Sequence, residues 1–275
     1  MRRIAAGLIV IMSVLLVSCK GKTGNTITVG SDKLDNTQSY FSESMHKAAR
    51  CDSGYYYLDK CGASADNLMF YDDKSEESIV LCNKPQCGHD GEECMAYISG
   101  SEFKSELYYY NSYIYMISSK GNLVQISADG TQRTDLGSIC VLSGQDSVSM
   151  CFNDGYAYVS QEITGDIEGN VTVRLYRFNL DTGSSNKIYE ETGYGIGINS
   201  LKTYGSDTFF LKTSVSKDDK GLYSLEGKGI FRITGENTEC LLDKNVYSYC
   251  IDADNNKLYY SGLGDGTIYE YDLGS

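Results

Sequence analysis

The amino-acid sequence predicts an all-β protein, a β-propeller built from about five degenerate four-stranded blades. Its composition favours strands and turns, with 24 tyrosines, 29 glycines, no tryptophan and one proline in 275 residues. Tyrosine and β-branched residues suit the pleated surface of a sheet, whereas glycine, asparagine and aspartate suit tight turns. No long segment shows the 3.6-residue apolar period of an amphipathic helix, so we expect strands throughout.

A pattern of two strands recurs five times along the chain. Each copy has a polar turn, a strand with paired aromatic residues, a spacer, and a second strand of alternating apolar residues. The second aromatic residue of each first strand recurs at intervals of roughly 40 to 60 residues, a period typical of propeller blades. One sheet cannot cover its own faces, so neighbouring sheets are expected to stack and bury these residues. The five aromatic residues are Tyr57, Tyr115, Tyr158, Phe210 and Tyr260.

The fifth repeat ends after its third-strand candidate, which runs from Ile268 to Asp272. A propeller usually closes by pairing an N-terminal strand with its last blade, and the short segment 27–29 could supply that strand. The alternative is a propeller that is incomplete and open at the C-terminus, with an unpaired strand edge. The sequence leaves both alternatives open.

The N-terminal residues have the features of an exported lipoprotein. Residues 1–3 are short and basic, and the uncharged segment 4–18 that follows is shorter than the roughly 20 apolar residues of a membrane span. It ends in Leu-Val-Ser before Cys19, which resembles the lipobox of bacterial lipoproteins. The resemblance implies attachment of diacylglycerol to Cys19 and cleavage before it, and two acyl chains give stable anchoring. The alternative is an ordinary secretory signal that happens to end in cysteine.

Three segments follow from these patterns. We expect a signal peptide over residues 1–18, a lipid anchor and flexible tether over 19–45, and the propeller domain over 46–275. The protein would then lie on the extracytoplasmic face of the cell membrane, with the membrane as one partner. The 37 acidic residues exceed the 24 basic ones and give a net charge of −13, which disfavours nucleic-acid binding.

A Cys/His-rich insert at 82–94 interrupts the first repeat. It has the spacing C-x4-C-x-H-x4-C and contains Cys82, Cys87, His89 and Cys94. Three thiolates and one imidazole form the ligand set of a closed tetrahedral zinc site, and glycines 88 and 91 are expected to allow the tight turns. Such a zinc would be structural, because four protein ligands leave no open position for water. A disulfide with a spare thiol, or three reduced cysteines, are the alternatives.

The remaining cysteines outside the insert and the lipobox number six, and sequence cannot settle their state. Neighbours along the chain could pair as disulfides, which exported proteins favour. Similar places in the repeats instead favour small buried residues, both for Cys51, Cys151 and Cys250 and for Cys82, Cys140 and Cys240. The nine cysteines after Cys19 are odd in number, so they cannot all pair within one chain. The neighbouring pairs would be Cys51 with Cys61, Cys140 with Cys151, and Cys240 with Cys250.

Two motifs suggest a family. The repeat from Asn111 to Thr131 reads N-x-Y-I-Y, then G-x-L-x-x-I-x-x-D-G-T, and the insert reads C-x-x-P-x-C-x-H-x-x-x-x-C. Both resemble the uncharacterised β-propeller lipoproteins of anaerobic Gram-positive bacteria. The resemblance covers about residues 50 to 275, and it implies a fold and a location but no activity.

Catalytic motifs are missing from the sequence. It contains no nucleophile elbow, phosphate loop or dinucleotide fingerprint, and we assign no catalytic residue. We therefore expect a non-enzymatic scaffold that binds a cell-surface protein or glycan. The alternative is an exported glycan hydrolase or lyase that uses carboxylates in the propeller funnel.

Overall fold

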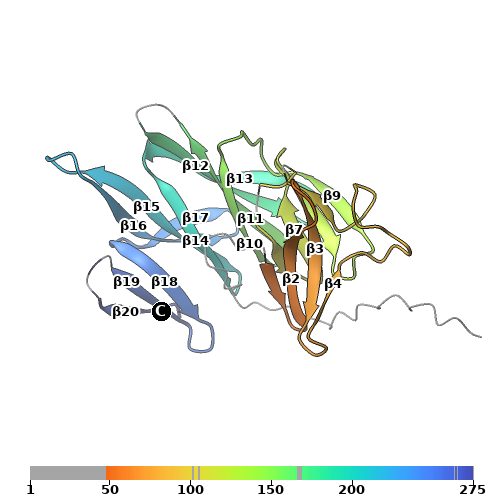
Figure 1. The fold of residues 1–275 in the computed structure, drawn as a ribbon. Helices are drawn as coiled ribbons and strands as arrows, with labels where there is room; N and C mark the ends of the chain where they lie inside the picture. The colour runs from red at the N-terminus through yellow and green to blue at the C-terminus, as the bar shows by residue number, and fades with distance from the viewer. Residues whose placement is uncertain are drawn as a thin grey trace, which may run out of the picture.

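The described residues form β-strands and turns only. They contain twenty strands in five antiparallel sheets (Figure 1), which confirms the all-β prediction. No helix long and apolar enough to cross a membrane occurs in this part of the chain. The predicted signal peptide, Cys19, the tether and the candidate strand at 27–29 lie outside the described residues. The computed structural model describes residues 48–100, 102–104, 106–165, 169–262, 264 and 266–274.

Strands that follow one another in sequence pair as neighbours within each sheet. The second sheet contains β6 (Tyr108–Tyr110), β7 (Tyr113–Ile117), β8 (Asn122–Ser127) and β9 (Arg133–Ser138). The third contains β10 (Ser147–Asn153), β11 (Tyr156–Thr164), β12 (Asn170–Asn179) and β13 (Ser185–Tyr194). The fourth contains β14 (Gly197–Tyr204), β15 (Asp207–Lys217), β16 (Tyr223–Thr234) and β17 (Asn237–Leu242). The fifth contains β18 (Val246–Asp252), β19 (Lys257–Gly262) and β20 (Ile268–Asp272).

The first sheet has a fourth strand in two pieces. The outer edge of β3 pairs with β4 through Met69–Asp72 and with β5 through Ala65–Asn67. The Cys/His-rich insert leaves the sheet between these two pieces and returns to it. Its strands are β1 (Ala48–Cys51), β2 (Gly54–Lys60), β3 (Ala65–Asp72), β4 (Glu77–Val80) and β5 (Tyr97–Ser99).

Four apolar cores lie between the five sheets, one in each gap between consecutive sheets. Each strand alternates its side chains between its two faces, so one strand serves two cores. In addition, the first strands of consecutive sheets contact one another, which gives the stack a propeller-like order. The cores include Tyr56, Phe70, Ile114 and Met116 in the first gap; Tyr115, Ile117, Ala157 and Phe178 in the second; Tyr158, Leu175, Ile198 and Phe210 in the third; and Phe209, Ile230, Tyr249 and Leu258 in the fourth.

The strand register corrects the sequence alignment of the repeats. Tyr115 and Tyr158 each lie two residues beyond the pair that closes the first hairpin of their sheet. In the other three sheets, the residue two positions beyond the hairpin pair is the one that precedes the aromatic residue predicted from the sequence. A shift of one residue moves a side chain to the opposite face of a sheet, so the predicted alignment mixed the two faces. The equivalent residues are Tyr56, Phe209 and Tyr259, in place of Tyr57, Phe210 and Tyr260.

Candidate metal centre and inner groove

The four predicted metal ligands lie together in the structure. One ligand atom from each of Cys82, Cys87, His89 and Cys94 can be chosen so that all four lie within 4.8 Å of one another. The Nδ1 atom of His89 is 3.3 Å from the Sγ atom of Cys94. This set of three sulfur atoms and one ring nitrogen fits a zinc ion, which prefers four such ligands in tetrahedral order.

The backbone turns of the insert differ from the prediction. The left-handed conformation occurs at Gln86 (φ 59°) and His89 (φ 57°), and not at glycines 88 and 91. A residue other than glycine pays of order 1 kcal/mol or more for this conformation. The tight turns that glycines 88 and 91 were expected to allow are present, but the residues in the left-handed conformation are Gln86 and His89. The strained turn at His89 places its ring against Cys94.

Burial ties the insert to the first core. Cys94 is only 3% exposed and belongs to that core, and partly buried Cys82 and Cys87 pack against it. Leu81 is fully buried and donates its N–H to the carbonyl oxygen of Leu68 on β3. The first sheet and its core therefore hold both ends of the segment that carries the four ligands.

The thiols differ in acidity because their surroundings differ. Burial disfavours the Cys82 thiolate, but N–H groups of Lys84 and Met95 and the neighbouring thiols hold the pKa of Cys82 below its ordinary value. Burial raises the pKa of Cys94 to about 12, and the nearby thiols Cys82 and Cys87 act in the same direction. A bound cation removes this penalty, because metal coordination deprotonates a thiol.

All nine described cysteines are free thiols. Cys51, Cys140 and Cys151 are buried, as the repeat-packing interpretation predicts. Cys240 and Cys250 are exposed, so that interpretation is wrong for these two, and Cys61, to which it gave no place, is exposed as well. Cys140 lies in the second core and Cys151 in the third.

A second candidate site lies along the first strands of the sheets. One cavity of about 220 Å³ is lined by residues of β10 and β14 together with Glu106, Tyr108, Ser160 and Glu162. A second cavity of about 320 Å³ lies between β14 and β18. Asn199 and Ser200 line both cavities, so we treat them as one inner groove.

The shared wall of the inner groove has unusual backbone geometry. Ser200 has φ 53° and lies in a bulge of the pairing between β14 and β15. The hydroxyl of Tyr249 on β18 donates a 2.6 Å hydrogen bond to the carbonyl oxygen of Ser200. Oε1 of Glu162 accepts a 3.0 Å hydrogen bond from the N–H of Ile198. These two bonds fix β14 between its neighbouring sheets and set the shape of the groove.

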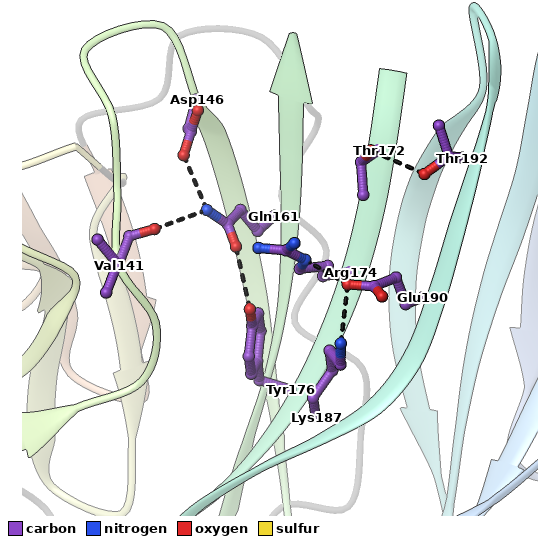
Figure 2. A network of polar contacts seen from close by, with 9 residues as sticks. All are labelled: Val141, Asp146, Gln161, Thr172, Arg174, Tyr176, Lys187, Glu190 and Thr192. Carbon is purple, nitrogen blue, oxygen red and sulfur yellow. Dashed lines mark hydrogen bonds and ion pairs between the residues drawn. The ribbon is translucent and has the colours of Figure 1, made fainter. Parts of the chain in front are cut away.

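A buried polar network supports the strand that carries Glu162 (Figure 2). Nε2 of Gln161 donates to the carbonyl oxygen of Val141 at 2.9 Å and to Oδ2 of Asp146 at 2.8 Å. The hydroxyl of Tyr176 donates to Oε1 of Gln161 at 3.2 Å. Gln161 is fully buried, and an unsatisfied buried amide would be costly. The network therefore holds β11 against the connection between β9 and β10.

Sequence reasoning did not find the groove residues. It anticipated carboxylates in a central funnel, but with 37 acidic residues it had no basis for choosing any of them. Glu106 and Glu162 share a cavity only because β6, β10 and β14 are brought side by side by the stacking of sheets. No local motif marks either residue.

Comparisons with known proteins do not give this chain a family. No family model matches it, and no curated protein matches it. Among solved structures, an oligogalacturonate lyase in complex with manganese aligns with TM-score 0.45 and 10% identity, over 75% of this chain and 53% of that one. The computationally designed Ika8 protein aligns with TM-score 0.45 and 13% identity, over 82% and 57%. The present chain thus spans little more than half of either protein.

Proposed function

We propose that this protein is a membrane-anchored surface lipoprotein whose stacked sheets form a non-enzymatic binding scaffold. The observation that carries the binding role is the inner groove, because four sheets contribute residues to it. A rigid stack that presents one continuous groove is suited to recognition. The lipobox-like segment before Cys19 supports the anchor.

In this proposal the five sheets are the blades of a β-propeller. Their first strands would line its axis, and the inner groove would lie there. The support is the order of contacts between first strands and the four cores in the four gaps.

The lining of the inner groove limits its ligand chemistry. Ser147, Ser149 and Ser160 offer hydroxyl groups, and Glu106 and Glu162 offer carboxylates. The described residues that line the groove include no lysine or arginine. A glycan or a protein segment with hydroxyl or amine groups fits this lining better than an anion does.

The binding proposal is tested with cell-wall extract and a glycan array, using the purified protein as bait. Glu162→Gln keeps an oxygen that can accept the Ile198 N–H but removes the charge, and we expect it to weaken binding about tenfold or more. Glu236→Gln, at an exposed turn, is the matched control and should bind as the wild type does. Absence of any ligand in both screens would contradict the proposal.

The anchor is tested with labelled fatty acid in the native host. Cys19→Ala should abolish both incorporation of the label and retention in the membrane fraction, because the thioether cannot form without the thiol. A variant that is still labelled would show that Cys19 is not the lipidated residue.

A glycan hydrolase or lyase is the second candidate function. The observation that favours it is the presence of two carboxylates, Glu106 and Glu162, in one cavity, since glycoside hydrolysis commonly uses such a pair. Activity screening on cell-wall and plant polysaccharides separates the two functions. Product formation that disappears in both Glu106→Gln and Glu162→Gln would establish the enzyme.

The metal centre has a structural role in this proposal. Cys82, Cys87, His89 and Cys94 would hold zinc and close the insert that separates β4 from β5.

A further inference from the structure

Every internal gap between sheets is built from the same pair of faces. We call the side of a sheet that packs against the following sheet its forward face, and the side that packs against the preceding sheet its backward face. Tyr56, Tyr115, Tyr158 and Phe209 lie on forward faces of the first four sheets. By register, Tyr259 occupies the same place on the fifth sheet.

The forward face of the fifth sheet repeats that of the third, residue by residue. In the third sheet Cys151 pairs with Tyr158, and Ser160 lies between Ser149 on β10 and Leu175 on β12. The hydroxyl groups of Ser149 and Ser160 are 2.8 Å apart. The fifth sheet has the same arrangement, with a distance of 3.0 Å between its two serine hydroxyls. Its residues are Cys250 opposite Tyr259, Ser248 opposite Ser261, and Ile268 opposite Ser261.

The two faces differ in what covers them. In the third sheet Cys151, Tyr158, Ser160 and Leu175 are at most 4% exposed, because the fourth sheet packs on them. In the fifth sheet Cys250 is exposed and Ile268 is 75% exposed. The residues equivalent to Ile268 in the other sheets are all 0% exposed, and they are Leu68, Leu123, Leu175 and Ile230.

The backward face of the first sheet also has no sheet packed on it among the described residues. Its residues Tyr55, Tyr57, Met69 and Tyr71 are half-buried or exposed, with Tyr55 at 41%. The equivalent residues of the second sheet lie in the first core and are at most 7% exposed. They are Ile114, Met116, Val124 and Ile126.

We propose that the forward face of the fifth sheet docks on the backward face of the first sheet of a second copy of this chain. The contact would be a further instance of the interface that already occurs four times inside the molecule. In the described residues the two faces lie at opposite ends of the stack and do not cover each other (Figure 1), and a second copy of the chain can supply the partner face for each. Such a contact is heterologous, and it gives a closed ring or an open filament according to its rotation.

The fifth sheet also differs from the other sheets at its outer edge. The described residues contain no fourth strand beside β20, whereas β4 with β5, β9, β13 and β17 fill that place in the other sheets. An unpaired edge offers free N–H and carbonyl groups to a neighbouring chain.

Complementation between two variants tests the proposal. Two differently tagged full-length chains are co-expressed, and the membranes are then solubilised in detergent. Copurification of one tagged chain with the other is measured. Ile268→Lys places a charge on the forward face, and Tyr55→Lys places one on the backward face. Each variant alone should lose at least about 90% of copurification, since every copy then lacks one of the two faces.

The mixture of the two variants decides the outcome. Ile268→Lys chains keep an intact first sheet and Tyr55→Lys chains keep an intact fifth sheet, so mixing them should restore pairing. Restored pairing also shows that both variants fold. Leu222→Lys, at a residue 65% exposed away from both faces, is the control and should pair like the wild type.

Three results would overturn the proposal. The first is a wild-type chain that does not copurify with itself. The second is a mixture of variants that fails to pair although both variants unfold cooperatively. The third is a wild type that is monomeric, together with an Ile268→Lys variant whose thermal unfolding midpoint is lower than that of the wild type. This result would indicate that the forward face of the fifth sheet is covered within one chain.

Discussion

The first and fifth sheets differ in how their outer edges and faces are completed. The outer edge of β3 is covered by β4 and β5, with the Cys/His-rich insert between them. In the described residues the fifth sheet ends at β20, and its Ile268 is 75% exposed where the equivalent Leu68 of the first sheet is 0% exposed. The same sequence pattern therefore produces a core residue or a surface residue according to what packs on it.

The largest expected effect is a difference in stability between alanine substitutions at these two equivalent positions. Leu68→Ala should lower the free energy of unfolding by about 2–5 kcal/mol, because it leaves a cavity in a closed core. Ile268→Ala should change it by less than about 0.5 kcal/mol in dilute solution, as for an ordinary surface residue. Urea unfolding followed by circular dichroism measures both variants. Equal losses would show that Ile268 is covered within one chain.

A second prediction concerns the insert that completes the first sheet. Protein purified without chelator should contain about one zinc ion per chain, and Cys87→Ser should lose it. Zinc that binds only the folded state stabilises it by roughly 3 kcal/mol when its free concentration is 100-fold above Kd. Metal analysis with thermal unfolding measures both quantities.

Hydrogen exchange locates the effect of zinc. Removal of the metal should speed exchange in β4 and β5, while β19 and β20 of the fifth sheet serve as the internal control. Metal-free protein of unchanged stability would contradict a zinc centre.

The smallest expected effect concerns Cys151 and Cys250, which occupy equivalent places in the third and fifth sheets. Burial raises the pKa of Cys151 far above its ordinary value, so its thiolate is scarce and inaccessible in the folded protein. In dilute solution, where the forward face of the fifth sheet is not docked on a second copy, an alkylating reagent at pH 8 should modify Cys250 at least about tenfold faster than Cys151. Mass spectrometry of digested samples measures the two rates, and in urea they should become equal. Comparable rates in the folded protein would mean that the core between the third and fourth sheets opens and exposes Cys151.

Much of the fold follows from local sequence patterns. Alternation of apolar residues and turn chemistry predict strands, and the fivefold recurrence predicts stacked sheets. The ligand set of the insert was also predictable, because Cys82, Cys87, His89 and Cys94 lie close in sequence and their residue types match zinc. The structure brings these four residues together as expected.

Other features depend on contacts that no local pattern contains. The aromatic alignment was wrong by one residue in three sheets, because hairpin register decides which side of a sheet a residue faces. The choice of Glu106 and Glu162 for the inner groove also depends on which strands become neighbours.

The sequence by itself determined the all-β class, the repeat and the metal-ligand set, because each depends on residues close together in the chain. The tertiary structure alone decided burial. Cys151 and Cys250 are the same residue in the same place of a repeat, yet among the described residues only Cys151 is covered by a following sheet. Burial is a property of the neighbours that a face meets, and those neighbours are set by the stacking of whole sheets.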